Sequence, residues 1–393
     1  MGVDVPGVGY SIGVMRVQFV TRGVSGGTGT GRYARGVQPR LRAFGIDVVP
    51  TAPTPSPAVA NIARFGRRFG VDLATFFGSY PIAIPRVDAD VTHVTSQTMA
   101  TLLLRGRDNR PTVVTALDII PLLVADDPEL RAFGHPIDAI CYRIAMIGLR
   151  RADRVLAISH HTRETLIDVL RIPGDRIDVT HLGVDRTLFR PGAPSARATY
   201  GLPRDVPIAV YVGSDDPRKD LATLIRSLAT DTGRQARFHA LIVGPRQFAG
   251  QHEKLRQLIA RLDVRDRVTF LEGLPDDDVV GLLNLATCFV TPSLYEGFGL
   301  PALEAMACGT AVIYADATAS REIVGEAGVA FPPRDAKRLA RSIASLADDE
   351  SLRAALRERG LARSAEFTWE RTAEMTVAAY GRALGDARRG SMA

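Results

Sequence analysis

The sequence predicts an α/β protein built from two doubly wound parallel sheets. Short apolar runs alternate with helix-length amphipathic segments along the 393 residues, which is typical of βαβ units with buried parallel strands. The alternation stops at a Pro- and Gly-rich stretch, 189–194, and then restarts. Glycine-rich or charged turns directly follow several apolar runs, at the strand ends where open α/β sheets bind ligands.

Six candidate strands precede this stretch and six follow it. They are 16–20, 46–49, 91–94, 112–116, 155–158 and 178–181, then 208–212, 240–243, 268–271, 288–291, 311–313 and 329–331. Because each series is long enough to bury a core of its own, we expect an N-terminal domain over residues 1–190 and a C-terminal domain over 203–368. The amphipathic segment 369–384 predicts one more helix.

The composition is ordinary for a soluble globular protein, with 46% apolar and 23% charged residues. No apolar run approaches the roughly 18 residues of a membrane span, and the first fourteen residues lack the features of a signal peptide, so we expect a cytoplasmic protein. The net charge is +6, but only three of the 49 basic residues are lysines. This arginine bias indicates codon composition, so the positive charge is no argument for nucleic acid, and we expect none. The positive balance still favours phosphate-bearing partners.

A glycine-rich turn at 25–34 follows the first candidate strand and contains Gly29, Gly31 and Tyr33. Glycines let the backbone approach a ligand, and the amides of a following helix can point at it. We favour a loop that lines an acceptor or donor-phosphate cleft, and a structural turn without a ligand is the alternative. A nicotinamide site is a third interpretation, but Asp47 lies inside the next strand, where it is poorly placed to hold a ribose.

The most informative segment is 294–310, which begins Leu-Tyr-Glu-Gly-Phe-Gly-Leu-Pro. Pro301 at an early helical position places residues 297–300 at a helix N-terminus, where unpaired amides hold phosphate. Glu296 precedes this helix and Glu304 lies about one turn inside it, so both carboxylates could face one ligand. An acidic helix start favoured by the dipole would explain Glu296 but not the glycine spacing.

This segment resembles the E-x7-E motif of the family 4 retaining glycosyltransferases of group 1 type. The resemblance implies the GT-B fold, in which two Rossmann-like domains face a cleft, and transfer of sugar from a nucleotide-activated donor. It implies that Glu296 contacts the donor sugar and Glu304 the ribose hydroxyls. The other donor-binding residues that it implies here are Gly297, Phe298, Gly299 and Leu300.

Arg218 and Lys219 form a cationic pair after the first strand of the second series. Such a pair suits a diphosphate leaving group, whose negative charge grows as the sugar bond breaks, although a solvated charged turn is the alternative. The segment is similar to the Val-Gly-x-x-x-Pro-Arg-Lys-Asn pattern of the family, which places Gly213 at the donor. Ser214 replaces a common arginine, so Arg218 is expected to share the phosphate contact, and Asp220 replaces the usual Asn or Gly.

The N-terminal domain is expected to hold the acceptor. Residues 112–118 resemble the family's strand that ends in His-Asp, but Leu117 replaces the histidine and leaves Asp118 to orient the acceptor. His93 and His135 are alternative imidazoles, although a lone histidine is more often structural. In relatives the last helix crosses back, so we expect residues 369–393 to pack on this domain.

Three other signals carry less weight. Asp88-Ala89-Asp90 spells the D-x-D metal motif of another glycosyltransferase fold, but it only opens a strand, and 276–278 is an acidic helix start. We therefore expect no metal and no cofactor besides the nucleotide-sugar substrate. Residues 61–69 could form a basic amphipathic face for the inner membrane surface or a lipid-linked acceptor, with a plain surface helix as the favoured alternative.

These features predict a retaining, metal-independent glycosyltransferase that moves a hexosyl group by front-face transfer. GDP-mannose is the first expectation for the donor, followed by UDP-glucose and UDP-N-acetylglucosamine, and the acceptor is a glycan, a lipid-linked sugar or a small molecule. Catalytic roles are expected for Glu296, Lys219, Arg218 and Asp118. Two alternatives remain open: a nucleotide-sugar epimerase or phosphorylase on the same architecture, and an inactive nucleotide-sugar-binding protein.

Overall fold

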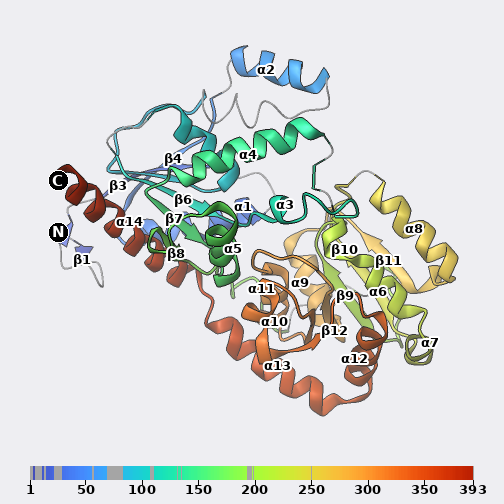
Figure 1. Cartoon of the computed structure of the whole chain (residues 1–393). Coiled ribbons are helices and arrows are strands. Elements are labelled where there is room, and N and C mark those ends of the chain that lie inside the picture. The colour runs from blue at the N-terminus through green and yellow to red at the C-terminus, as the bar shows by residue number, and fades with distance from the viewer. Residues whose placement is uncertain are drawn as a thin grey trace. The chain divides into compact units, whose positions relative to one another are not determined.

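The chain divides into two compact units in the computed structural model (Figure 1). Unit 1 comprises Met1–Gly183 with Trp369–Ala393, and unit 2 comprises Val184–Thr368. The structure describes residues 3–4, 11–12, 15–21, 29–54, 57–68, 83–106, 110–130, 132–133, 135–192, 197, 199–248 and 250–392. The division between the units falls shortly before the Pro- and Gly-rich stretch at which the strand pattern restarts.

Unit 1 is built on a six-stranded parallel sheet with the strand order β4-β3-β5-β6-β7-β8. The strands are β3 (Arg16–Val20), β4 (Asp47–Thr51), β5 (Val91–Val94), β6 (Thr112–Ala116), β7 (Arg154–Ala157) and β8 (Ile177–Val179). Every residue of β5 and β7 is buried, as expected for a sheet covered on both faces. A short antiparallel pair, β1 (Val3–Asp4) with β2 (Ser11–Ile12), was not predicted.

Unit 2 repeats this plan with the order β11-β10-β9-β12-β13-β14, again entirely parallel. The strands are β9 (Ile208–Val212), β10 (His239–Val243), β11 (Val268–Leu271), β12 (Cys288–Thr291), β13 (Val312–Ala315) and β14 (Gly328–Phe331). Two doubly wound sheets were predicted, and the fold class is confirmed. In this sheet the strand order reverses between β9 and β12, which makes their carboxyl ends the expected ligand site.

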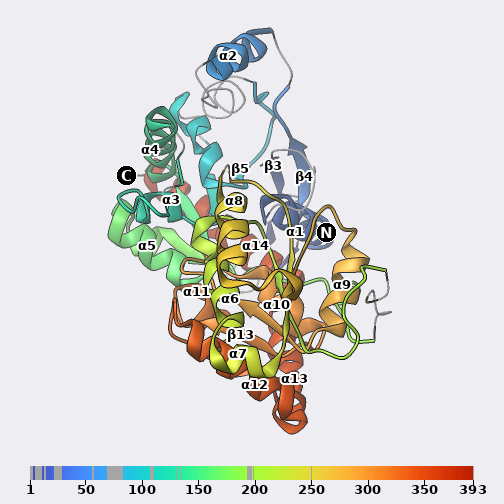
Figure 2. The ribbon, with the colours of Figure 1, turned by 90° about the vertical axis from the view of Figure 1, so that its right-hand side faces the viewer.

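Helices cover both faces of each sheet (Figures 1 and 2). In unit 1 they are α1 (Gly29–Ala43), α2 (Pro57–Arg68), η2 (Gln97–Leu104), α3 (Ile120–Leu123), α4 (Pro136–Arg150), α5 (His160–Leu170), η3 (Gly174–Arg176) and α14 (Trp369–Met392). In unit 2 they are η4 (Pro217–Lys219), α6 (Leu221–Leu228), α7 (Asp231–Ala236), α8 (Gln251–Leu262), η5 (Arg265–Arg267), α9 (Asp276–Leu285), α10 (Leu300–Ala307), α11 (Ala319–Ile323), η6 (Gly325–Ala327), α12 (Ala336–Asp348) and α13 (Glu350–Ala365). Among the described helices, none combines the length and the apolar character that crossing a bilayer requires.

The C-terminal helix α14 packs against α1, although their sequences lie at opposite ends of the chain. Gly36 makes this close approach possible, because a Cβ at its position would lie 2.2 Å from the ring of Trp369. Arg40 on α1 adds an ion pair of 3.0 Å with Glu370. The first and last helices of unit 1 are therefore joined by direct side-chain packing.

Candidate functional site

The turn after β9 requires a glycine at its first position. Gly213 has a φ of +154°, and a Cβ there would lie 2.4 Å from Oη of Tyr211. The same Tyr211 hydroxyl donates a hydrogen bond of 2.8 Å to the carbonyl of Ser214. Gly213 and the buried tyrosine therefore set the path by which the chain leaves the sheet.

Two aspartates shape the rest of this turn. Asp216 begins η4, and one of its carboxylate oxygens accepts the backbone N–H of Arg218 at 3.1 Å. Asp220 ends η4 in the left-handed conformation, with a φ of +46°, and begins α6 by accepting the N–H and the hydroxyl of Thr223. An Asp tolerates this conformation better than most residues and also caps a helix, so Asp220 serves where the family pattern has Asn or Gly.

The segment after β12 folds against this turn. The N–H of Leu294 donates to the carbonyl of Arg218 at 2.8 Å, and the N–H of Glu296 donates to Oγ1 of Thr318 at 2.9 Å. Thr318 has a φ of +49°, which is rare for a β-branched residue and is typical of tightly constrained functional loops. Gly299, with a φ of +99°, then begins α10.

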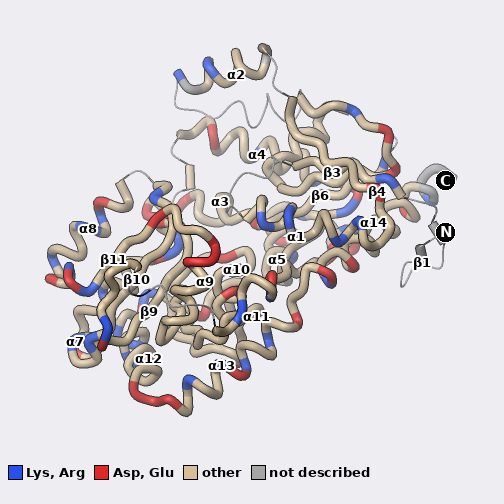
Figure 3. The backbone as a smooth tube through the Cα atoms, turned by 180° about the vertical axis from the view of Figure 1, so that it is seen from behind, with Lys and Arg blue, Asp and Glu red and all other residues tan. Residues whose placement is uncertain are grey.

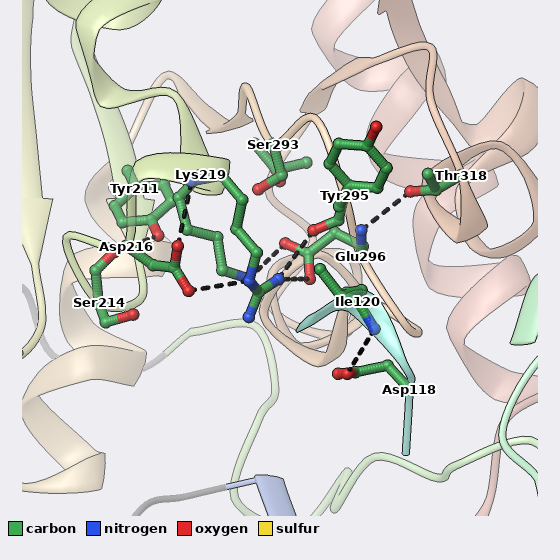
Figure 4. Close-up of polar contacts among 12 residues, drawn as sticks. Asp118, Ile120, Tyr211, Ser214, Asp216, Lys219, Ser293, Tyr295, Glu296 and Thr318 are labelled. Atoms are coloured by element: carbon green, nitrogen blue, oxygen red, sulfur yellow. Dashed lines mark hydrogen bonds and ion pairs between the residues drawn. The ribbon is translucent and has the colours of Figure 1, made fainter. Parts of the chain in front are cut away.

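A buried ion pair joins the two loops (Figure 4). Nζ of Lys219 lies 2.6 Å from Oε1 of Glu296, and the two side chains are only 14% and 11% exposed. Nη1 of Arg218 lies 3.8 Å from Oε2 of the same carboxylate. The arginine is held by Asp216 at 2.9 Å and by the carbonyl of Tyr295 at 2.8 Å. Two cations therefore converge on one carboxylate at a largely desolvated position.

The protonation states follow from this arrangement. Burial opposes ionisation of Glu296, but Lys219, Arg218 and a hydrogen bond from Ser293 outweigh it and hold the pKa of the carboxyl below its ordinary value. Burial lowers the pKa of Lys219, and the charge of Glu296 offsets only part of that effect. The carboxylate is therefore ionised at neutral pH, and the lysine beside it gives up its proton more readily than a solvated lysine.

The loops meet here because of the strand order. Arg218 and Lys219 follow β9, while Glu296 follows β12, and these two strands are neighbours at the point where the order reverses. Parallel strands end at the same edge of a sheet, and the connections diverge at such a point, which leaves room for a ligand.

The remaining residues predicted for donor binding are mostly buried. Glu304 lies in the second turn of α10 and is 3% exposed, and its charge adds to burial in raising the pKa of Cys308 to about 12. The ring of Phe298 is 3% exposed and makes an edge contact with Phe367, with ring centroids 5.9 Å apart. Phe298 can therefore offer a donor its backbone but not its side chain, and Leu300 is buried at the start of α10.

Sequence reasoning missed three residues that hold this site together: Asp216, Thr318 and Asp215. Asp215 is buried, and Oδ1 accepts the backbone N–H groups of Gln247 and Phe248, which ties the turn after β9 to the loop after β10. The Asp-Pro pair at 216–217, which is typical of a helix start, could have identified Asp216. No local pattern marks Asp215 or Thr318, because their partners are distant in sequence.

In unit 1, Asp118 follows β6 as predicted. Its Oδ1 accepts the N–H of Ile120, the first residue of the short helix α3, at 3.2 Å (Figure 4). The N–H of Leu117 donates to Oε1 of Gln97 at 3.1 Å. Gly29 begins α1 and Gly31 is buried in its first turn, whereas the glycines at 26 and 27 lie outside the described residues.

The prediction that Tyr33 lines a cleft is wrong for its side chain, which is fully buried. Its hydroxyl accepts a hydrogen bond of 2.9 Å from Thr115, and burial raises its pKa to about 12. His93 is also fully buried, within 2.6 Å of Oη of Tyr380 and 2.8 Å of Oγ1 of Thr115. Helix α14 carries Tyr380 and covers this polar cluster, which explains why Tyr33 and His93 do not reach solvent.

Neither histidine supplies the missing imidazole in this arrangement. Burial lowers the pKa of His93 to about 3, so the ring stays neutral and serves the polar cluster in the core. His135 lies before α4, where its Nδ1 accepts the N–H of Ile137 at 3.1 Å and caps the helix. Both residues therefore have structural roles.

The two acidic segments discounted as metal sites, 88–90 and 276–278, also have local structural roles. Oδ2 of Asp90 accepts the N–H of Arg16 at 2.7 Å, at the start of the unit 1 sheet. Asp276–278 forms the acidic first turn of α9 (Figure 3), and Asp278 accepts a hydrogen bond from the hydroxyl of Tyr200. A favourable interaction with the dipole of α9 and local hydrogen bonds account for these positions.

Two protein-family models match the chain, one in each half. Glycosyltransferase Family 4 matches residues 27–188, and Glycosyl transferases group 1 matches residues 193–363. The chain belongs to this family of glycosyltransferases. The second match contains both loops of the ion pair, so the site described above lies in the part of the chain that carries the family's group 1 domain.

Curated relatives agree with this assignment. The chain is 32% identical to O-antigen chain mannosyltransferase B of Escherichia coli over 63% of its own length and 65% of the relative's. It is 33% identical to a D-inositol 3-phosphate glycosyltransferase of Mycolicibacterium smegmatis over 67% of its own length and 58% of the relative's. The chain thus spans less than two thirds of the length of these relatives.

The fold of this glycosyltransferase is also similar to HepE of Anabaena, solved in complex with UDP and glucose. The TM-score is 0.70 at 20% identity, and the likeness covers 92% of this chain and 98% of the other. At this level of identity the likeness establishes the fold, and it confirms the GT-B architecture that the sequence predicted.

Proposed function

We propose that this chain is a retaining, metal-independent glycosyltransferase whose donor diphosphate binds at the Lys219–Glu296 pair. The observation that carries the proposal is the convergence of Lys219 and Arg218 on one buried carboxylate, with Gly299 and the start of α10 in the same loop system. A diphosphate would meet two desolvated cations and the amides of a helix N-terminus there. These groups stabilise phosphate without requiring a metal.

The proposed reaction breaks the bond between the anomeric carbon and the diphosphate oxygen, and the bonding electrons leave with the diphosphate. Lys219 and Arg218 stabilise the charge that grows on that oxygen, and Glu296 orients the sugar. The acceptor hydroxyl bonds the anomeric carbon on the same face, and its proton passes to the departing diphosphate. Preorganised charges of this kind contribute most where charge develops in the transition state.

GDP-mannose remains the first donor to test, because the O-antigen relative is named a mannosyltransferase. UDP-glucose comes next, because HepE was solved with UDP and glucose. We propose that unit 1 holds the acceptor, with Asp118 orienting its hydroxyl. A lipid-linked acceptor would bring unit 1 to a membrane surface, where α2 presents Phe65 at 61% exposure.

Calorimetric binding of GDP, UDP and NAD in chelator-treated buffer tests the proposal first. We expect saturable binding of one nucleoside diphosphate that weakens at least tenfold in Glu304→Ala, which removes the proposed ribose contact. Glu358→Ala, an exposed site on α13, is the matched control and should bind like the wild type. Binding of NAD alone, or no nucleotide binding, would contradict the proposal.

Turnover then separates a transferase from its alternatives. With the donor that binds, Lys219→Ala should slow transfer about 100-fold if it acts like other preorganised charge stabilisers. NMR of the product should show the anomeric configuration of the donor. Donor binding without transfer to any of a broad set of acceptors would favour an inactive binding protein, and rearrangement of donor without acceptor would favour an epimerase.

A further inference from the structure

A cavity of about 900 Å³ opens in unit 1 at the amino ends of its strands. Its wall includes Thr112 at the start of β6, Arg154 at the start of β7, and Arg176 just before β8. Parallel strands begin at one edge of a sheet and end at the other, so this cavity lies at the edge opposite to Asp118, which follows β6. It is therefore distinct from the predicted acceptor loops of the same unit.

The wall of this cavity is strongly basic. Its arginines are Arg86, Arg105, Arg110, Arg151, Arg154 and Arg176. Among the wall residues that the structure describes, the acidic ones are Asp153, Asp175 and Asp386, so these described residues together carry a positive formal charge. Ile84, Leu102 and Leu103 add an apolar side. A cavity of this size with a basic and an apolar part suits a small organic ligand that carries negative charge.

Two of the three wall carboxylates are already engaged. Asp153 accepts both the N–H and the hydroxyl of Thr112 at 2.8 Å. Asp386 on α14 lies 3.1 Å from Nη1 of Arg154, whose Nε lies 2.6 Å from Asp178. Arg382 adds a second cation 2.8 Å from Asp178, so two arginines and two aspartates form a neutral ion-pair network at the base of the cavity, in which Arg154 is only 6% exposed. The positive charge that remains belongs to the other arginines.

Some of these arginines are anchored and retain free donors. Nη1 of Arg105 donates to the carbonyl of Ile84 at 2.9 Å, and Nη2 of Arg176 donates to backbone carbonyls of 150 and 152. Within the described part of the chain, their other N–H groups and the whole guanidinium of Arg151 have no hydrogen-bond partner. An anchored arginine loses less conformational entropy when it binds an anion, and its planar fork matches phosphate oxygens.

We propose that this cavity is a second anion site that binds a phosphate ester or diphosphate group, with the rest of the ligand against Ile84 and Leu103. A phosphate monoester carries a charge of about −1.5 to −2 near neutral pH, which the guanidinium groups of Arg105, Arg151 and Arg176 can balance. A monocarboxylate would leave most of that positive charge unmatched. The group belongs either to a soluble metabolite or to the headgroup of an anionic lipid, since both offer the same chemistry.

Inorganic pyrophosphate is the probe for the soluble source, measured by calorimetry at constant ionic strength in chelator-treated buffer. Pyrophosphate can also bind the proposed donor site, so the measurement is made in Lys219→Ala. We expect saturable binding in that background, weakened at least tenfold when Arg105→Gln and Arg151→Gln are added, because each removes a charged hydrogen bond. Arg143→Gln, an exposed arginine on α4 outside the cavity wall, is the control and should leave binding unchanged.

Vesicles of phosphatidylcholine with and without phosphatidic acid test the lipid source. A lipid headgroup would be assigned if the protein cosediments only with vesicles that contain phosphatidic acid. This cosedimentation should also require Arg105 and Arg151, and pyrophosphate should release the protein from the vesicles. Pyrophosphate binding without cosedimentation would assign a soluble ligand. Two outcomes would overturn the proposal. In the first, Lys219→Ala alone abolishes pyrophosphate binding and no such cosedimentation occurs. In the second, the variant with both arginine substitutions has a native circular dichroism spectrum and still binds pyrophosphate and vesicles like its parent. These outcomes do not depend on whether the chain transfers sugar.

Discussion

Replacing Lys219 with methionine should destabilise unit 2 because it leaves Glu296 buried without its nearest cation. Nζ and Oε1 are 2.6 Å apart, and at an effective dielectric constant of about 20 that separation corresponds to a Coulomb attraction of about 6 kcal/mol. Desolvation of both ions offsets much of this attraction. Removing one partner of such a pair typically costs about 3–5 kcal/mol. Arg218 stays 3.8 Å from the carboxylate, so we expect a loss near the lower end, about 3 kcal/mol.

The pH dependence gives this prediction its sign. In the wild type the folded-state pKa of Glu296 is lowered, so the stability that the ionised carboxylate contributes is present above its unfolded-state pKa. That stability is lost as the pH falls through the folded-state pKa. Without Lys219, burial should raise the folded pKa above the unfolded value. The variant then regains stability relative to the wild type as the pH falls, and its deficit should be largest at pH 7 and clearly smaller near pH 5.

Hydrogen exchange read by mass spectrometry measures this deficit locally. Peptides that cover β9 and β12 should exchange faster in Lys219→Met, while peptides that cover β6 in unit 1 serve as an internal reference. Lys337→Met, an exposed lysine on α12, is the matched control. Adding Glu296→Gln should recover at least half of the loss, because a neutral amide does not need the cation. A deficit that is independent of pH, or no recovery in the double variant, would refute the electrostatic reasoning.

Three further changes test other parts of the structure. Gly36→Ala should shift the fluorescence of Trp369 and lower the free energy of unfolding by about 1–3 kcal/mol through overpacking, although alanine is the better helix former. Gly385→Ala on α14 is the control: its methyl group meets no neighbour, so this variant should be neutral or stabilising. His93→Asn should reduce the loss of folding stability between about pH 6.5 and pH 4, because the folded wild type resists protonation of a ring whose pKa is about 3. The same loss of stability with falling pH in variant and wild type would count against a buried, neutral His93. Asp216→Asn should weaken the 2.9 Å ion pair that positions Arg218, and it should lower kcat about tenfold with little change in KM. A change in KM alone would instead indicate that Asp216 acts in donor binding.

Local patterning was enough to predict the twelve strands of the two sheets. Buried parallel strands are short continuous apolar runs, and each is bounded by turns that the sequence marks with glycine, proline or charge. The glycines of the turns after β9 and β12 were equally readable, because Gly213 and Gly299 both adopt positive φ values at strand-to-helix turns. Arg218, Lys219 and Glu296 were predicted from chemistry at such turns and from family resemblance.

What the sequence could not reveal depends on segments that meet only in the folded chain. Tyr33 follows a glycine turn and reads as a cleft residue, but α14, more than 300 residues later, covers it and encloses His93 through Tyr380. The ion pair of Lys219 with Glu296 spans 77 residues, and the order of β9 and β12 in the sheet decides it. The sequence alone determined which segments become strands, helices and turns, because these depend on neighbours along the chain. Which side chains become buried together was decided by the tertiary structure, because burial depends on segments that local patterns do not pair.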